Sequence, residues 1–191
     1  VIVSADDPGP ISSQTEQDTR RFADFCRIPV FDPSSPEEAY KMIGEAFEYS
    51  EKYNTPVLFR PTTRVCHAYA SIDNCDSPSP KKYEGFVKDS KKWVIFPRLS
   101  FANHIMIEKR NVEIGKDFST YSANKAEGVN SEKAVVTSGI SYAYTKECLK
   151  DYPDVKLIKI ATAYPFPEDF VLSSLEGAKE VLCIEELSPF I

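Results

Sequence analysis

Short apolar runs alternate with helical patterns along most of this chain, and that alternation constrains the fold more than any other feature. In the first 65 residues the expected strands and helices follow one another in a β-α-β-α-β order, at residues 1–5, 14–25, 28–31, 36–53 and 57–60. Consecutive strands separated by helices favour a parallel sheet whose crossover helices pack on its faces. The chain is therefore predicted to be an α/β protein.

The same order of elements returns near the end of the chain. The expected strands and helices lie at residues 134–139, 142–149, 155–160, 167–177 and 180–186. No close sequence repeat accompanies this second unit. The sequence thus predicts one architecture used twice.

The helix that follows Ser35 has the clearest local signals. Ser35 is the expected N-cap, Pro36 occupies the first helical position, and Glu38 completes an S-x-x-E capping box. A narrow apolar stripe is expected to face the core, formed by Ala39, Ile43, Ala46, Phe47 and Ser50.

The middle of the chain has a different character. Residues 76–82 have a linker composition, and residues 86–101 mix lysines with aromatic residues and a proline, which predicts irregular chain. Residues 103–118 are expected to form one long helix, and residues 119–132 a second loop. The predicted organisation is a first unit at 1–70, a linker and long helix at 71–131, and a second unit at 132–191.

Composition and charge exclude several classes of protein. With 191 residues and a net charge of −6, the chain lacks the basic surface expected of a nucleic-acid-binding protein. No apolar run approaches the roughly 20 residues needed to span a membrane. The five cysteines are irregularly spaced without a C-x-x-C pair, which predicts reduced thiols in the cytoplasm and no metal ligands. The start has no signal-peptide pattern and no initiator Met, so we expect a piece of a longer protein.

Two polar segments come directly after expected strands, where open α/β sheets bind ligands. The first runs from Asp6 to Asp18 and could line a substrate pocket or a subunit contact, or could simply cap the next helix. The second runs from Arg60 to His67. Its arginines and threonines could hold a carboxylate or phosphate, or could be surface residues paired with acidic neighbours. Adjacent Cys66 and His67 do not suit a nucleophile pair.

Two further groups have weaker signals. Glu185 and Glu186 end the last expected strand and could contact a partner or an amine, cap neighbouring helix ends, or remain solvated. His104 lies near the start of the long helix, where a structural role is expected.

Several segments together resemble the α subunit of indolepyruvate ferredoxin oxidoreductases. The resemblance rests on residues 5–20, 28–40, 56–67, 137–140 and 183–187, above all on D-D-P-G-P-I-S-S-Q and R-P-T-T-R-V-C-H. It implies a thiamine-diphosphate enzyme that oxidatively decarboxylates indolepyruvate and other arylpyruvates. The implied products are aryl-acetyl-CoA, CO2 and reduced ferredoxin, with electrons passing through 4Fe–4S clusters.

The resemblance also implies how the chain fits into such an enzyme. Residues 1–70 would be the second half of a pyrimidine-type thiamine-diphosphate-binding domain. Residues 132–191 would be a truncated transketolase C-terminal-like three-layer α/β domain. The cofactor-activating Glu is expected before Val1, and the diphosphate–Mg²⁺ site and the iron–sulfur module after Ile191. The chain alone is then expected to bind no cofactor and to be inactive.

The resemblance implies a set of substrate- or cofactor-binding residues in the two polar segments, namely Asp7, Ser12, Gln14, Thr63, Arg64 and His67. Arg64 is the expected contact to the substrate carboxylate. Ile11 stands where the family has His, which would alter substrate preference or have no consequence. A β subunit, ferredoxin and an oligomeric assembly are the implied partners. Two alternatives stay open, a non-catalytic interaction module and a related pyruvate or 2-oxoglutarate enzyme.

Overall fold

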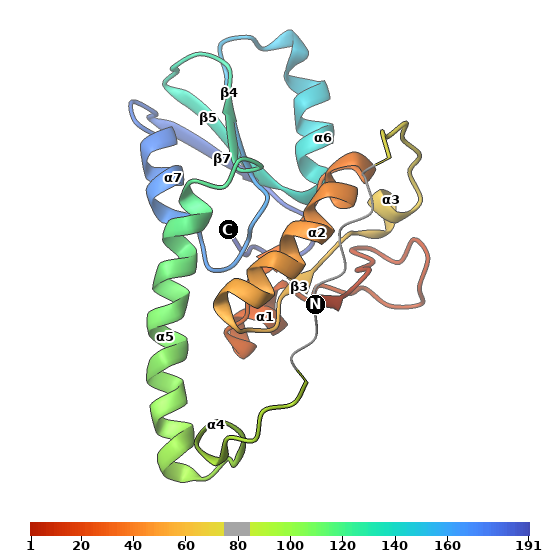
Figure 1. The fold of residues 1–191 in the computed structure, drawn as a ribbon. Coiled ribbons are helices and arrows are strands. Elements are labelled where there is room, and N and C mark those ends of the chain that lie inside the picture. Colours follow the sequence, from red (N-terminus) through yellow and green to blue (C-terminus); the bar gives the residue numbers. More distant parts are fainter. Residues whose placement is uncertain (75–84) are drawn as a thin grey trace.

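A computed structural model describes residues 1–74 and 85–191 of the chain. The predicted linker at 76–82 lies outside the described residues. Figure 1 shows two small sheets, with helices against each and one long helix along one side. The chain has the α/β class predicted from the alternation of its elements.

The first sheet is parallel, as expected. Its strands are β1 (Ile2–Val3), β2 (Val30–Phe31) and β3 (Leu58–Phe59), in the order β1-β3-β2. Leu58 at the centre pairs with Ile2 on one side and Val30 on the other. Crossover helices α1 (Arg20–Cys26) and α2 (Pro36–Tyr53) connect the strands, and a short helix α3 (Thr63–Cys66) follows β3.

Helix α1 begins at Arg20, so the prediction of a helix from residue 14 is wrong at its start. The preceding segment forms a loop tied to two aspartates instead. The backbone N–H of Thr19 donates to the Asp6 carboxylate at 2.6 Å, and that of Gln17 donates to the Asp7 carbonyl oxygen at 3.1 Å. These bonds hold the chain in a loop conformation until Arg20.

Helix α2 matches its predicted bounds but not all of its predicted contacts. Ser35 Oγ accepts from the Glu38 backbone N–H at 3.2 Å, as a capping box requires. The Glu38 carboxylate instead accepts from the N–H and hydroxyl of Ser34, at 2.7 and 2.8 Å, and pairs with Lys159 of the second sheet. This distant lysine draws Glu38 away from the reciprocal bond.

The buried face of α2 is also shifted from the predicted stripe. Met42 and Ala46 are fully buried, whereas Phe47 is 56% exposed. The cause is the long helix, whose Phe118 packs with Met42 and Phe31 in one core cluster. This distant neighbour sets which face of α2 turns inward.

The second sheet has four strands in the order β4-β6-β5-β7. They are β4 (Lys125–Glu127), β5 (Lys133–Ser138), β6 (Lys156–Ile160) and β7 (Glu180–Ile184). Strand β4 was expected to be loop, and its antiparallel pairing with β6 is a correction. Its three residues have no apolar run, so only the tertiary partner makes them a strand. Helices α6 (Gly139–Cys148) and α7 (Glu168–Ser174) flank the sheet, with a 3-10 turn η1 (Leu149–Asp151).

The long helix α5 spans Pro97–Ser119, so it begins six residues earlier than predicted. Part of the segment expected to be irregular is therefore helical, including the short α4 (Ser90–Trp93). Pro97 explains the start, since proline suits the first turn of a helix. None of the described helices is long and apolar enough to cross a membrane.

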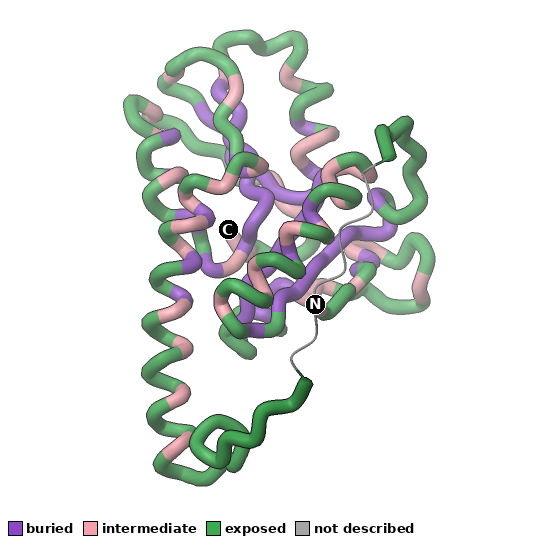
Figure 2. The backbone as a smooth tube through the Cα atoms, viewed as in Figure 1, coloured by how far each residue is buried: buried purple, intermediate pink, exposed green. Residues whose placement is uncertain are grey.

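The two sheets are joined by backbone pairing. The Val30 N–H donates to the Tyr164 carbonyl at 2.7 Å, and the Asp32 N–H donates to the Ala161 carbonyl at 2.8 Å. The segment after β6 thus closes the free edge of β2. Figure 2 shows the buried backbone concentrated where the two units meet, and the far half of α5 largely exposed.

Candidate functional site

The carboxyl ends of parallel strands from both sheets converge at the junction between the two units. Asp6 follows β1, Asp32 follows β2, Arg60 follows β3 and Glu185 follows β7. In α/β proteins ligands bind outside this end of the strands. The polar residues after the strands are therefore the place to look for a site.

The inner part of this junction is a buried ionic cluster, formed by Asp6, Asp18, Arg20, Asp32, Arg60 and Glu185. Arg60 is 1% exposed; its Nε pairs with Asp6, and its Nη1 lies 3.3 Å from Asp32 Oδ1. The expected pairing of Arg60 with acidic neighbours is confirmed, but the expected surface position is wrong, because the side chain is buried. Its polar contacts bind the ends of all three strands of the first sheet.

Arg20 links this cluster to the end of the chain. Its guanidinium pairs with Asp18 at 2.7 Å and Glu185 at 2.9 Å, and donates to the Glu186 carbonyl at 2.8 Å. Its Cζ lies 5.3 Å from the centre of the Phe190 ring. Glu185 is therefore an internal ion-pair partner, and the expectation that it stays solvated is wrong.

The buried ionic cluster and its neighbour Glu186 hold more carboxylates than guanidinium groups. Burial raises the pKa of Asp32, and burial raises the pKa of Glu186 to about 7. Burial alone would also raise the pKa of Asp18, but the hydrogen bond from Arg20 and the charge of Arg60 lower it. Burial thus favours the protonated forms of Asp32 and Glu186, whereas the arginines favour the ionised form of Asp18.

Asp7 organises the loop at the outer part of the junction. Its Oδ2 accepts the backbone N–H groups of Ile11, Ser12 and Ser13 at 3.1, 2.7 and 2.6 Å, and Thr63 Oγ1 donates to its Oδ1 at 2.9 Å. The hydrogen bond from Ser13 N–H, followed by that from Ser12, holds the pKa of Asp7 well below its ordinary value. Asp7 is an ionised anchor for the loop.

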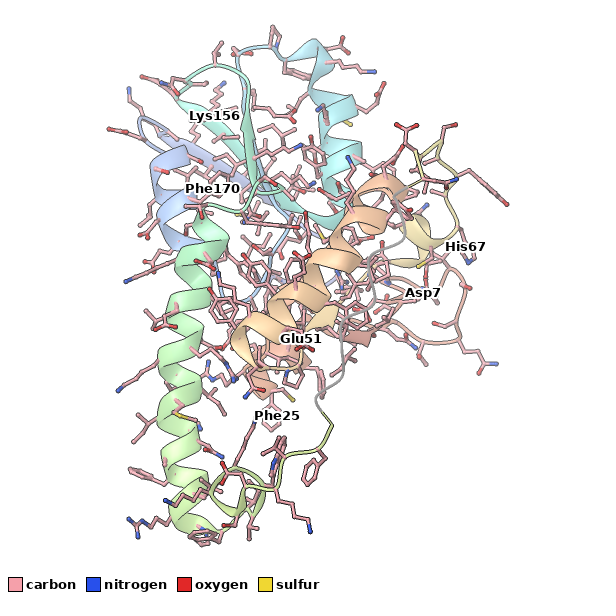
Figure 3. All side chains as sticks on the ribbon, viewed as in Figure 1. Asp7, Phe25, Glu51, His67, Lys156 and Phe170 are labelled. Carbon is pink, nitrogen blue, oxygen red and sulfur yellow. The ribbon has the colours of Figure 1, made fainter. Side chains whose placement is uncertain are left out.

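An open cavity of about 280 Å³ lies beside this anchored loop, and we call it the Arg64 pocket. Its walls are Ile11, Thr63, Arg64, His67, Ala68 and Tyr144. Arg64 is exposed on α3 and His67 is exposed directly after it. The Arg64 Cζ lies 5.7 Å from the centre of the Tyr144 ring of α6. Figure 3 shows Asp7 and His67 on the same side of the molecule.

The six residues predicted for the site have different positions. Thr63, Arg64 and His67 line the Arg64 pocket together. Asp7 and Ser12 shape the loop that carries Ile11 to the pocket wall. Gln14 is exposed on the loop and is not part of the wall.

Sequence reasoning missed Tyr144 because it comes from the other unit. Tyr144 is 50% exposed on α6 and contacts the Arg64 guanidinium. His104 is exposed on α5, where its Nε2 lies 3.6 Å from Glu108 one turn along the helix. Nothing local in the sequence joins residues 64 and 144.

The described residues do not fit every group implied by the resemblance. Within residues 1–74 and 85–191, no three or more His, Cys, Asp or Glu side chains gather as metal ligands. The loop N–H groups that could receive a diphosphate are occupied by Asp7, and acidic groups dominate the buried ionic cluster. The junction therefore does not fit a diphosphate–Mg²⁺ group or an iron–sulfur cluster. The exposed guanidinium of Arg64 does fit a small carboxylate.

Comparison with known proteins gives a consistent result. No protein-family model matches the sequence. The chain is 37% identical to indolepyruvate oxidoreductase subunit IorA of Thermococcus kodakarensis, 35% to that of Methanothermobacter thermautotrophicus and 30% to that of Archaeoglobus fulgidus. Each match covers 100% of this chain and 31% of the relative, so the chain spans about a third of these subunits.

A solved structure shows the fold. The 2-oxoglutarate:ferredoxin oxidoreductase of Magnetococcus marinus, with 2-oxoglutarate, coenzyme A and succinyl-CoA bound, matches with a TM-score of 0.64 at 16% sequence identity. The match covers 95% of this chain and 40% of that one. Together with the whole-length sequence matches, this confirms the resemblance: over its whole length the chain matches about a third of the indolepyruvate oxidoreductase IorA subunits.

Proposed function

We propose that this chain is a region of an enzyme that oxidatively decarboxylates arylpyruvates, indolepyruvate among them, to aryl-acetyl-CoA and CO2 while reducing ferredoxin. The observation that carries this proposal is the match of the whole chain, at 30–37% identity, to six IorA subunits. The fold shared with a 2-oxoacid enzyme supports it. The proposed partners are a β subunit and ferredoxin, in a cytoplasmic assembly.

The Arg64 pocket is the proposed contact to the 2-oxo acid. Arg64 is the cation on its wall that has no carboxylate partner among the ion pairs of the described residues. A guanidinium presents a planar pair of donors that matches a carboxylate. Thr63 and His67 lie on the same wall and orient the acid, and Tyr144 holds Arg64 from the other side. Ile11 gives the pocket an apolar wall for an aryl group.

The division of the chain follows from the same proposal. Residues 1–70 are the second half of a pyrimidine-type domain, 71–131 a linker with the long helix, and 132–191 a transketolase C-terminal-like domain. Thiamine diphosphate supplies the carbon nucleophile when bound, and coenzyme A accepts the acyl group. The described residues do not fit the diphosphate, Mg²⁺ or a 4Fe–4S cluster, so we assign these groups to other parts of such an enzyme.

The substrate proposal is tested with the intact parent protein and its partner subunit under anaerobic conditions. Coenzyme A-dependent dye reduction is followed with indolepyruvate, phenylpyruvate, pyruvate and 2-oxoglutarate. We expect the highest kcat/KM with the two aryl acids. A preference for pyruvate or 2-oxoglutarate, from protein with intact clusters, would replace the arylpyruvate assignment with one of the related activities.

Substitution at position 11 sharpens this test. Ile11 is 51% exposed on the pocket wall, so Ile11→His introduces an imidazole without disturbing a core. We expect the ratio of kcat/KM for indolepyruvate over pyruvate to change by several-fold. Lys88→Ala, on an exposed segment far along the chain, is the matched control and is expected to leave that ratio unchanged.

The 191-residue chain alone is expected to show no turnover, because the junction between its two units does not fit a diphosphate–Mg²⁺ group. The purified chain is incubated with thiamine diphosphate, Mg²⁺ and labelled indolepyruvate, and released CO2 is measured. Release above the protein-free background would overturn this expectation.

A further inference from the structure

A second cavity, of about 590 Å³, lies between the two units and takes no part in the proposed function. We call it the inter-unit cavity. One wall is the first half of α2, and the other comes from β4, β6, α6 and η1; Figure 1 shows the start of α2 beside α6. The volume lies within the range of roughly 300–1,000 Å³ that is typical of small-molecule sites. The inter-unit cavity shares no lining residue with the Arg64 pocket.

The two walls of the inter-unit cavity have opposite charge. The α2 wall has three glutamates and one lysine, namely Glu37, Glu38, Glu45 and Lys41. The wall from the second unit has four lysines and one glutamate, namely Lys125, Lys146, Lys150, Lys159 and Glu147. Among the described residues a single ion pair, between Glu38 and Lys159, joins the two walls. The inter-unit cavity is therefore negative on one side and positive on the other.

Two glutamates of the α2 wall have no cationic partner among the ion pairs of the described residues. Glu37 accepts hydrogen bonds from its own backbone N–H and from the Ser35 hydroxyl, which lower its pKa. Glu45 accepts a hydrogen bond from the hydroxyl of Tyr121. Carboxylates whose present partners are neutral groups can still accept an ammonium group.

Lys125 is the corresponding cation of the opposite wall. The antiparallel pairing of β4 with β6 places it directly across from Lys159, and like charges at opposed positions of a sheet repel each other. Burial lowers the pKa of Lys159, and the charge of Lys125 adds to that effect. Lys146 pairs with Glu127 at 2.7 Å, whereas Lys125 forms no ion pair within the described part of the chain. A carboxylate bound at Lys125 would relieve this repulsion.

The lining of the inter-unit cavity also includes apolar and aromatic groups. Met42 of α2 is 1% exposed, and its neighbours on the lining are the small residues Ala123 and Ala143 and the rings of Tyr121 and Tyr142. Small-molecule sites combine an apolar lining with a few charged groups that fix the orientation of the ligand. These residues can therefore receive an apolar side chain.

We propose that the inter-unit cavity binds a free α-amino acid with a large apolar side chain. The ammonium group pairs with Glu37 and Glu45, and the carboxylate pairs with Lys125. A phosphate or dicarboxylate would be repelled by the glutamates of α2, and a polyamine by the lysines opposite. A zwitterion matches both walls at once. This proposal does not rest on the proposed function.

The test measures binding to the intact parent protein by isothermal titration calorimetry. The probes are L-leucine, 4-methylpentanoate, which lacks the ammonium group, and 3-methylbutylamine, which lacks the carboxylate. We expect a dissociation constant for leucine at least tenfold lower than for either analogue, because each analogue leaves one charged wall without a partner. Glycine, which has no side chain to pack on Met42, is expected to bind at least tenfold more weakly than leucine. An analogue that binds as tightly as leucine would overturn the proposal.

Substitutions locate the bound amino acid. Glu37→Gln and Lys125→Gln are each expected to raise the dissociation constant of leucine at least fivefold. Glu113→Gln and Lys88→Gln, at exposed positions outside the inter-unit cavity, are the matched controls and are expected to leave it unchanged. Arg64→Ala is expected to bind leucine like the wild type, because it changes the other pocket. Urea midpoints verify that each variant is folded.

Three results would contradict this assignment. The first is no heat of binding with leucine at about 10 mM, a concentration that would detect even millimolar affinity. The second is binding that survives both Glu37→Gln and Lys125→Gln, since the amino acid then lies elsewhere. The third is binding that is lost in Arg64→Ala and kept in Lys125→Gln, which would place leucine in the Arg64 pocket.

Discussion

Two arginines four residues apart have opposite surroundings, although both belong to R-P-T-T-R after β3. Arg60 is 1% exposed and lies between Asp6 and Asp32. Arg64 is exposed on the first turn of α3 and contacts the Tyr144 ring. The comparison shows that the distance of each arginine from the end of β3 decides its role. Arg60 pairs with the aspartates that follow β1 and β2, whereas Arg64 is available to bind a ligand.

The largest expected effect is on stability, from Arg60→Leu. Removing this cation leaves Asp6 and Asp32 buried without their partner, which should cost about 3–5 kcal/mol of unfolding free energy. Urea denaturation followed by circular dichroism measures it. Arg64→Leu is the matched control and should change stability by less than about 0.5 kcal/mol. Equal effects of the two substitutions would contradict the contrast drawn between them.

A smaller effect is expected from Gly139→Ala, which probes how closely the second unit approaches the buried ionic cluster. Gly139 has φ +50°, and a Cβ there would lie 3.1 Å from both carboxylate oxygens of Asp32. Strain and crowding should destabilise the fold by about 1–3 kcal/mol. Gly44→Ala, in open space within α2, is the control and should stabilise by roughly 0.5–1 kcal/mol. A neutral Gly139→Ala would mean that the two units are less closely packed.

The third effect is pH dependence from Glu186. Its pKa is raised by burial to about 7 in the fold, above the ordinary 4.5, so its contribution to stability is present below about pH 4.5 and lost as pH rises through 7. The wild type should therefore lose about 1 kcal/mol relative to Glu186→Gln between pH 5 and 8, after allowance for solvent screening. Parallel urea titrations at the two pH values measure this difference. A stability difference between the wild type and Glu186→Gln that is the same at pH 5 and pH 8 would show that Glu186 is solvated.

The sequence predicted the α/β class because strand and helix patterns are local and strong. The parallel first sheet, the bounds of α2 and the strands β5, β6 and β7 follow from apolar runs and capping residues. Strand β4 could not be predicted, since Lys125–Glu127 has no apolar signal of its own. The prediction that α1 starts at residue 14 was also wrong, because the side chains of Asp6 and Asp7 accept hydrogen bonds from the preceding loop.

The site was predictable only within each segment. Thr63, Arg64 and His67 are neighbours in sequence and remain neighbours on the pocket wall. Two other contacts join residues 80 or more positions apart in the sequence. Tyr144 lies beside Arg64, and Arg20 pairs with Glu185. Such contacts depend on how the two sheets dock, for which the residue pattern has no local signal.

The most direct test of the contrast between Arg60 and Arg64 is the steady-state kinetics of Arg64→Ala in the intact parent enzyme with indolepyruvate. Loss of a charged hydrogen bond to the substrate carboxylate should raise KM by about tenfold or more, with kcat changed much less. The urea midpoint of the variant should equal that of the wild type. An unchanged KM, in protein that is fully folded, would contradict the assignment of Arg64 as the substrate-binding arginine.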